Sequence, residues 1–183
     1  MTQQQKAALL RLCRQTVEAT VRGLPAPVPA ECISHIDHGG AFVTLRLQRS
    51  LRGCMGTFSP EPDITATVQQ AATSAAGDPR FKSCPIKPDE LEELQIEVSI
   101  LSSLQETQDP LSLEVGTHGI VVETRRGRGC FLPQVATEQG WTAEQFLSHC
   151  SADKAQAGPD AWREDSNRVL LFTSEHFKEP LCG

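Results

Sequence analysis

Several features are absent from this chain of 183 residues, and each absence removes a class of protein. The chain has no tyrosine and only 5% aromatic residues, so it lacks the stacking surfaces typical of proteins that bind single-stranded nucleic acid. A net charge of −6 argues against a surface that grips phosphate backbones. No apolar run approaches the roughly 20 residues of a membrane span, and the first residues do not form a secretory signal. We therefore expect a globular protein of the cytoplasm.

The number and spacing of the cysteines argue against both a disulfide framework and a metal site. The seven cysteines are an odd number, and none forms a Cys-x-x-Cys pair. We interpret them as free thiols in a reducing compartment, most of them acting as small buried apolar residues. Cys32, His35 and His38 have residue types that bind zinc or iron, but no fourth ligand lies nearby. We expect no metal and no other cofactor.

The apolar pattern predicts helices and strands in an irregular order. Residues 3–22 carry a helical apolar stripe that ends at Gly23. Asp63 is a suitable N-cap for a second helix over residues 64–76, whose small residues favour close packing on a sheet. Strands are expected over residues 41–47, 96–100 and 168–173, with a hairpin over residues 119–132 and a helix from Thr142 to about Cys150. Strands and helices do not alternate regularly, which indicates an α+β fold with a largely antiparallel sheet flanked by helices.

The most informative local feature is the hexapeptide Leu51–Gly56, with the sequence LRGCMG. It follows a period-2 run, so Arg52 and Cys54 are expected to share a face of a strand. An arginine beside a thiol favours the thiolate, the reactive form of cysteine. Gly53 and Gly56 have no Cβ, so another backbone or a ligand can approach closely. The hexapeptide therefore predicts a small site.

The hexapeptide, together with the run before it, resembles the signature of the AMMECR-type domain, which is protein A of the so-called AmmeMemoRadiSam system. Further matches follow in the same order along the chain: Asp78-Pro79-Arg80-Phe81, residues 96–101, Gly116–Ile120, Leu132–Ala136, Gly140-Trp141 and Asp160-Ala161-Trp162. The resemblance covers residues 5–177 and implies one AMMECR-type domain of a larger and a smaller subdomain. Residues 1–4 and 178–183 are then expected to be flexible termini. Two departures are Met55, where members often carry isoleucine, and a longer segment between Cys150 and Trp162.

What the resemblance implies about function is an association rather than a reaction. Members are associated with Memo-like proteins and radical S-adenosylmethionine enzymes, which are the expected partners. The residues implied in ligand binding are Arg52, Gly53, Cys54, Gly56, Arg80, Glu97, His118 and Gln134. Glu97 is expected to pair with Arg52 or Arg80, either to bind a small anionic or amide ligand or to fix how the two subdomains pack.

Three functional hypotheses follow from these residues. The first is an accessory protein that binds a small ligand or a partner at a pocket centred on Leu51–Gly56. The alternative is a cysteine-dependent enzyme in which Cys54 is the nucleophile and His118 the base. A weaker alternative is a regulator associated with nucleic acid through the basic loop Arg125–Arg128.

Overall fold

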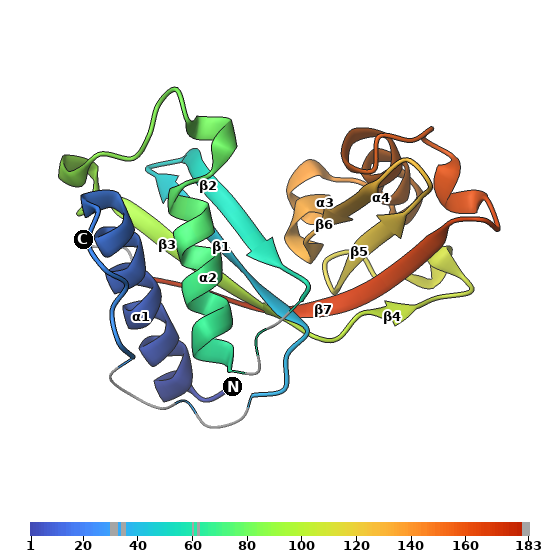
Figure 1. The fold of residues 1–183 in the computed structure, drawn as a ribbon. Helices are drawn as coiled ribbons and strands as arrows, with labels where there is room; N and C mark the ends of the chain where they lie inside the picture. The colour runs from blue at the N-terminus through green and yellow to red at the C-terminus, as the bar shows by residue number, and fades with distance from the viewer. Residues whose placement is uncertain (30–32, 34–35, 60, 62, 181–183) are drawn as a thin grey trace. The chain divides into compact units, whose positions relative to one another are not determined.

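The computed structural model describes residues 1–29, 33, 36–59, 61 and 63–180 (Figure 1). The chain divides into two compact units, each of which is described by itself. Unit 1 comprises residues 1–101 and 175–183, and unit 2 comprises residues 102–174. The larger unit is therefore built from two separate stretches of the chain.

The two helices of unit 1 begin and end at the residues that the sequence predicts. Helix α1 spans Gln3–Arg22; the Thr2 side chain accepts a hydrogen bond from the Gln5 N–H, and the Gln5 side chain accepts one from the Thr2 N–H. Gly23 ends this helix in the left-handed conformation, with φ of 67°. Helix α2 spans Ile64–Ala76, and the Asp63 carboxylate accepts the Thr65 N–H as its N-cap.

Both helices cover one face of an antiparallel sheet in unit 1. Strand β1 (Gly40–Leu47) lies between β2 (Ser50–Thr57) and β3 (Leu94–Leu101). Helices α1 and α2 lie side by side over this sheet (Figure 1). Alternate residues of β1, such as Val43 and Leu45, are fully buried in the core beneath the helices. The intervening residues lie on the opposite face, which we call the second face of the sheet.

The last strand, β7 (Arg168–Lys178), runs from unit 2 into unit 1, where it lies beside β3. In unit 1, the Glu175 carboxylate forms ion pairs with the amino group of Met1, at 3.0 Å, and with Lys6 Nζ, at 2.7 Å. Arg14 of α1 pairs with Glu179 and donates to two backbone carbonyls at 2.6 Å. These contacts tie both ends of the described chain to α1 and to the sheet.

The expected flexible termini therefore coincide partly with ordered elements. Thr2 is the N-cap of α1 and Gln3 its first residue, while Lys178 is the last residue of β7. Residues 181–183 lie outside the described part of the chain.

Unit 2 is a smaller antiparallel sheet with short helices. Its strands are β4 (Gln105–Glu106), β5 (His118–Glu123), β6 (Arg128–Phe131) and the first part of β7, in the order β4-β7-β5-β6. Its helices are α3 (Pro133–Gln139), α4 (Ala143–His149) and a π-helical turn, Cys150–Lys154. The predicted hairpin and the predicted N-cap Thr142 are both confirmed. The core of this unit contains Ile120, Val122, Phe146, Leu147 and Trp162.

Single turns of 3-10 helix complete the description: η1 (Pro79–Phe81), η2 (Pro88–Glu90), η3 (Pro110–Ser112) and η5 (Ala161–Arg163). The predicted α+β class, with antiparallel pairing and a larger and a smaller part, is confirmed. Within the described ranges, no helix combines the length and apolarity needed to span a membrane.

Candidate functional site

A β-bulge divides the hexapeptide into two sides. Along β1 and β2, Leu45 pairs with Gly53 and Arg46 pairs with Leu51, so Arg52 is an extra residue without a partner in the register. The bulge interrupts the alternation that would otherwise place Arg52 and Cys54 on one face. The two residues make separate sets of contacts.

Arg52 is held by the segment that precedes and includes η2. Its guanidinium donates to both carboxylate oxygens of Glu90, at 2.6 and 3.1 Å, and to the carbonyls of Pro85 at 3.2 Å and Cys84 at 3.4 Å. The hydrogen bond from Arg52 and a second from the Lys87 N–H lower the pKa of Glu90 to about 2. The Arg52 side chain therefore fixes a loop instead of facing the Cys54 thiol.

The peptide group of Cys54 is held by the Asp78-Pro79-Arg80-Phe81 motif. Strand β2 is the outer strand of the unit 1 sheet, and the Cys54 N–H and C=O point away from β1. The Cys54 N–H donates to Asp78 Oδ2 at 3.0 Å, and Arg80 Nη2 donates to the Cys54 carbonyl at 2.8 Å. Two groups that would leave the sheet edge open are thus satisfied by side chains.

Asp78 is the centre of this arrangement. Its side chain is 1% exposed, and its carboxylate accepts hydrogen bonds from the Arg80 guanidinium, the Arg80 N–H and the Cys54 N–H. Burial disfavours the charged carboxylate, but the hydrogen bonds from Arg80 and from the two backbone N–H groups outweigh it, so the pKa of Asp78 is lowered. Asp78 is a central residue of this hydrogen-bond network that the sequence analysis did not single out beyond its place in the motif.

The Cys54 thiol lies in a line of polar side chains across the second face, which we call the polar row: Cys54, Thr44, Glu97 and His176. Thr44 Oγ1 donates to Cys54 Sγ at 3.4 Å, and Thr44 pairs in register with both Cys54 and Glu97. His176 Nε2 lies 4.0 Å from Glu97 Oε2. The row joins four neighbouring strands, and His176 is a member that the sequence analysis missed.

Glu97 has different partners from those expected. The sequence analysis pairs it with Arg52 or Arg80, but these arginines bind Glu90 and Asp78. The cation nearest to Glu97 is Arg46, with its Nε 3.8 Å from Glu97 Oε1. The Glu97 side chain is only 15% exposed. Its basic neighbours, Arg46 and His176, lie at the long distances of 3.8 and 4.0 Å.

Gly53 and Gly56 make room for protein rather than for a ligand. A Cβ on Gly53 would lie 2.1 Å from the Ala75 carbonyl oxygen, near the end of α2. A Cβ on Gly56 would lie 2.2 Å from the Ala41 carbonyl oxygen and 2.4 Å from the Phe42 ring. The sequence leaves open whether another backbone or a ligand approaches these glycines closely. In the structure, a backbone carbonyl lies against each of them.

The two remaining predicted residues, His118 and Gln134, belong to unit 2. His118 begins β5, and its Nδ1 accepts a hydrogen bond from the Glu114 N–H at 3.0 Å. Since Nδ1 accepts this hydrogen bond, the neutral ring carries its proton on Nε2. Gln134 lies in the first turn of α3 and is half-buried. His118 also lines a pocket of about 450 Å³ with Ser102, Gln105, Thr107 and Thr173, all of unit 2.

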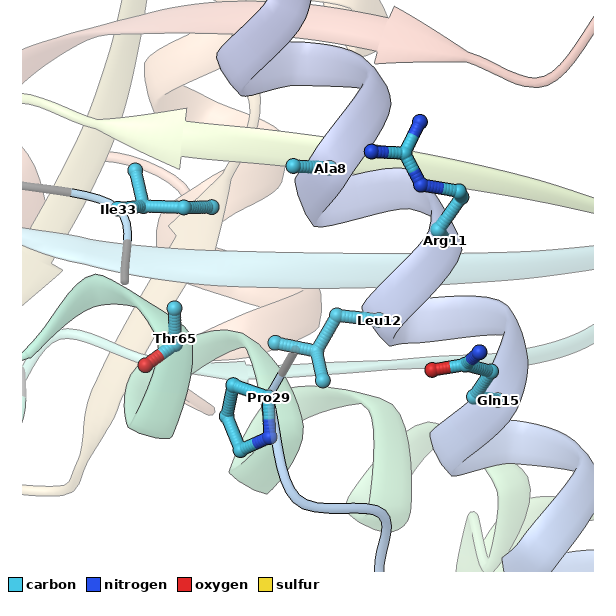
Figure 2. A pocket seen from close by; sticks show the side chains of 7 residues that line it. All are labelled: Ala8, Arg11, Leu12, Gln15, Pro29, Ile33 and Thr65. Carbon is cyan, nitrogen blue, oxygen red and sulfur yellow. The ribbon is translucent and has the colours of Figure 1, made fainter. Parts of the chain in front are cut away.

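Two cavities lined by described residues of unit 1 differ in character. Figure 2 shows the smaller, of about 60 Å³, which is lined by Ala8, Arg11, Leu12 and Gln15 of α1, by Thr65 of α2, and by Pro29 and Ile33. It is far below the volumes of 300 Å³ or more that are usual for ligand sites. The larger has a volume of about 380 Å³ and lies on the Arg52 side of the hexapeptide; we call it the edge pocket.

The possible metal ligands are only partly within the described residues. Cys32 and His35 lie outside them. His38 contacts the Ile36 carbonyl at 2.8 Å and Thr67 Oγ1 at 3.1 Å, so both of its ring nitrogens have protein partners. Over the described ranges, no three His, Cys, Asp or Glu side chains are grouped to hold a metal ion. Cys13, Cys54, Cys84, Cys130 and Cys150 form no disulfide.

Comparisons with known proteins agree on one family. A model of the AMMECR1 family matches residues 10–177. A protein of Methanothermobacter thermautotrophicus is 38% identical over 93% of this chain and 92% of its own length. Protein TK0174 of Thermococcus kodakarensis is 37% identical over 93% and 88%, respectively. The crystal structure of uncharacterized protein PH0010 from Pyrococcus horikoshii superposes with a TM-score of 0.90 at 31% identity, covering 99% of this chain and 94% of that one.

Proposed function

The chain belongs to the AMMECR1 family, and from this premise we propose that it is an accessory binding protein working with a Memo-like protein and a radical S-adenosylmethionine enzyme. Its binding centre is the Leu51–Gly56 hexapeptide: Cys54 and the polar row form the partner contact on one side, and the edge pocket on the other side is open to a small ligand. The protein acts in the cytoplasm with its cysteines as free thiols. No cofactor is part of the proposal.

The observation that carries this proposal is how completely Cys54 is held in place. Its N–H, its carbonyl and its thiol each have a partner, in Asp78, Arg80 and Thr44. Its thiol faces a hydroxyl that donates to sulfur, whereas a nucleophile requires a base that accepts its proton. A sheet face that presents a thiol, a hydroxyl, a carboxylate and an imidazole from four neighbouring strands is suited to recognition.

The proposal predicts that the partner contact depends on Glu97. Charge reversal in Glu97→Arg is expected to weaken binding to the Memo-like protein of the same organism at least tenfold, because it places a cation beside Arg46 and His176. Isothermal titration with the purified partner measures the effect. The matched control is Glu92→Arg, an exposed residue two positions before β3, which should leave the affinity unchanged. Absence of binding by the wild type, or equal binding by Glu97→Arg, contradicts the proposal.

The cysteine-dependent enzyme is kept as the second candidate because a cation lies near Cys54. The pKa of Arg80 is raised chiefly by its hydrogen bond with Asp78, and the Cys54 side chain contributes in the same direction. Arg80 therefore takes the place that the sequence analysis gives to Arg52. In this alternative His118 remains the candidate base, although its Nδ1 accepts the Glu114 N–H.

Site-resolved alkylation separates the two candidates. Under the binding proposal, Cys54 should react with iodoacetamide several-fold more slowly than exposed Cys84, since its thiol is half-buried and contacts Thr44. Burial raises the pKa of Cys13 and Cys150, so both should stay unmodified until the protein unfolds and serve as internal references. Mass spectrometry of the folded protein over a range of pH measures each site. If Cys54 reacts fastest at neutral pH and Arg80→Gln abolishes that advantage, the enzyme hypothesis replaces the binding proposal.

A further inference from the structure

The edge pocket is formed where the outer strand, the end of α2 and the turn η1 meet. Its walls are contributed by residues 76–79, by Phe81 and Lys82, by Pro85 and Ile86, and by Arg52 from the bulge. Its volume of about 380 Å³ falls at the lower end of the range for small-molecule sites. All of these residues belong to unit 1, and the cavity therefore depends on that unit alone.

The surfaces of this pocket are mainly apolar and stiff. Pro79, Pro85, Phe81 and the buried Ile86 supply rings and a branched side chain. The Arg80 guanidinium carbon lies 5.7 Å from the centre of the Phe81 ring, which steadies that ring from outside. Rigid, flat walls suit a planar apolar ligand, because the side chains lose little conformational entropy when the ligand enters the pocket.

The charges around the pocket leave one cation uncompensated. The Arg52 guanidinium is paired with Glu90, and the Asp78 carboxylate is paired with Arg80. Lys82 is exposed at the rim, and no described acidic residue forms an ion pair with it. A ligand that lies against the apolar walls with an anionic group at the rim would complete this arrangement.

We propose that the edge pocket binds a small molecule with a planar, bicyclic-sized apolar body and a single carboxylate or similar anion, which contacts Lys82. The inference rests on the proposed binding function of the hexapeptide. It specifies the class of ligand that binds on the side of the hexapeptide where Arg52 lies. Arg52 acts here as a positioning residue: its bonds to the Pro85 and Cys84 carbonyls hold one wall in place.

The test compares two probes that share a ring system and differ in charge. Indole-3-acetate is the anionic probe and tryptamine the cationic one, each titrated into the 15N-labelled full-length chain. Indole-3-acetate should shift the amide signals of residues 76–78, 80–82 and 86 saturably, and tryptamine should bind at least tenfold more weakly. Lys82→Glu should weaken indole-3-acetate binding about tenfold by removing the attraction and adding repulsion. Arg49→Glu, which changes an exposed charge of the same unit outside the pocket, should leave it unchanged.

Each other outcome overturns the inference. Equal or tighter binding of tryptamine removes the anion preference, and shifts confined to other residues place the ligand elsewhere. No saturable shift with either probe at several millimolar removes the ligand site. The proposed function is judged separately, because partner binding is measured through Glu97 in the polar row, on the other side of the hexapeptide from Lys82. If partner binding persists while indole-3-acetate fails, only the inference about the edge pocket falls.

Discussion

Replacing Gly53 with alanine is expected to lower the free energy of unfolding by about 3 kcal/mol, and with valine to prevent folding of unit 1. The added Cβ would lie 2.1 Å from a backbone oxygen of α2, so relief requires a shift of the helix or the strand rather than of a flexible side chain. Overpacking in a core typically costs about 1–3 kcal/mol, and a collision with backbone belongs at the upper end. For a domain of this size the alanine variant should melt about 6–12 °C below the wild type.

Thermal and urea denaturation of the purified variants measure this effect. Gly77→Ala is the matched control in the same unit, because its nearest heavy atom would be 3.6 Å away and its φ is negative. The control should remain within about 0.5 kcal/mol of the wild type. A Gly53→Ala protein of unchanged stability would show that the glycine is not required for packing, and would restore the view that its space serves a ligand.

Removal of the Asp78 carboxylate is expected to have the second large effect. Asp78→Ala should lower the free energy of unfolding by about 3 kcal/mol, because the Cys54 and Arg80 N–H groups and the Arg80 guanidinium lose their acceptor at once. Arg80 is half exposed and regains water, so the larger part of the loss comes from the buried end of the network. Alkylation of Cys54 should also become faster, since its peptide group is no longer held.

The pH dependence provides a signature that packing damage alone would not produce. The folded-state pKa of Asp78 is below the ordinary value of 3.8, so its stabilisation is complete above that pH and disappears as the pH falls through the lowered folded value. The difference in stability between the wild type and Asp78→Ala should therefore narrow in acid. Asp160→Ala removes an exposed aspartate whose carboxylate lies 3.4 Å from Arg163 Nε, and should change stability by less than about 0.5 kcal/mol at any pH. If the difference in stability between the wild type and Asp78→Ala stays constant down to low pH, the electrostatic explanation is contradicted.

The sequence predicted the parts of this fold that depend on local signals. The ends of α1 and α2 follow from Thr2, Gly23 and Asp63, whose capping groups bond to residues two or three positions away or adopt a special φ. The hairpin of unit 2 follows from alternation on both sides of a basic, glycine-containing loop. In each case the determining interaction lies within one turn or one strand pair, which is the range over which a pattern can be interpreted.

The site was predicted less completely because its contacts join distant residues. Alternation places Arg52 beside Cys54, but a single extra residue in β2 breaks the period, and no feature of LRGCMG marks the bulge. Asp78 lies 24 residues from Cys54, and its motif was recognisable while its acceptor role was not. His176 joins the polar row only because β7 lies beside β3, and that pairing depends on topology rather than on the residues near position 176.

The discontinuous make-up of unit 1 has a consequence for synthesis on the ribosome. Residues 102–174 of unit 2 are contiguous and emerge before the last strand of unit 1 is available. Until residues 175–179 arrive, β3 has an unpaired edge and α1 lacks Glu175 and Glu179, the acidic partners of Lys6 and Arg14. An open strand edge is a template for wrong pairing, so the nascent chain is most exposed to aggregation while residues 102–174 are being made. The part of the protein that contains the hexapeptide is thus begun first and completed last.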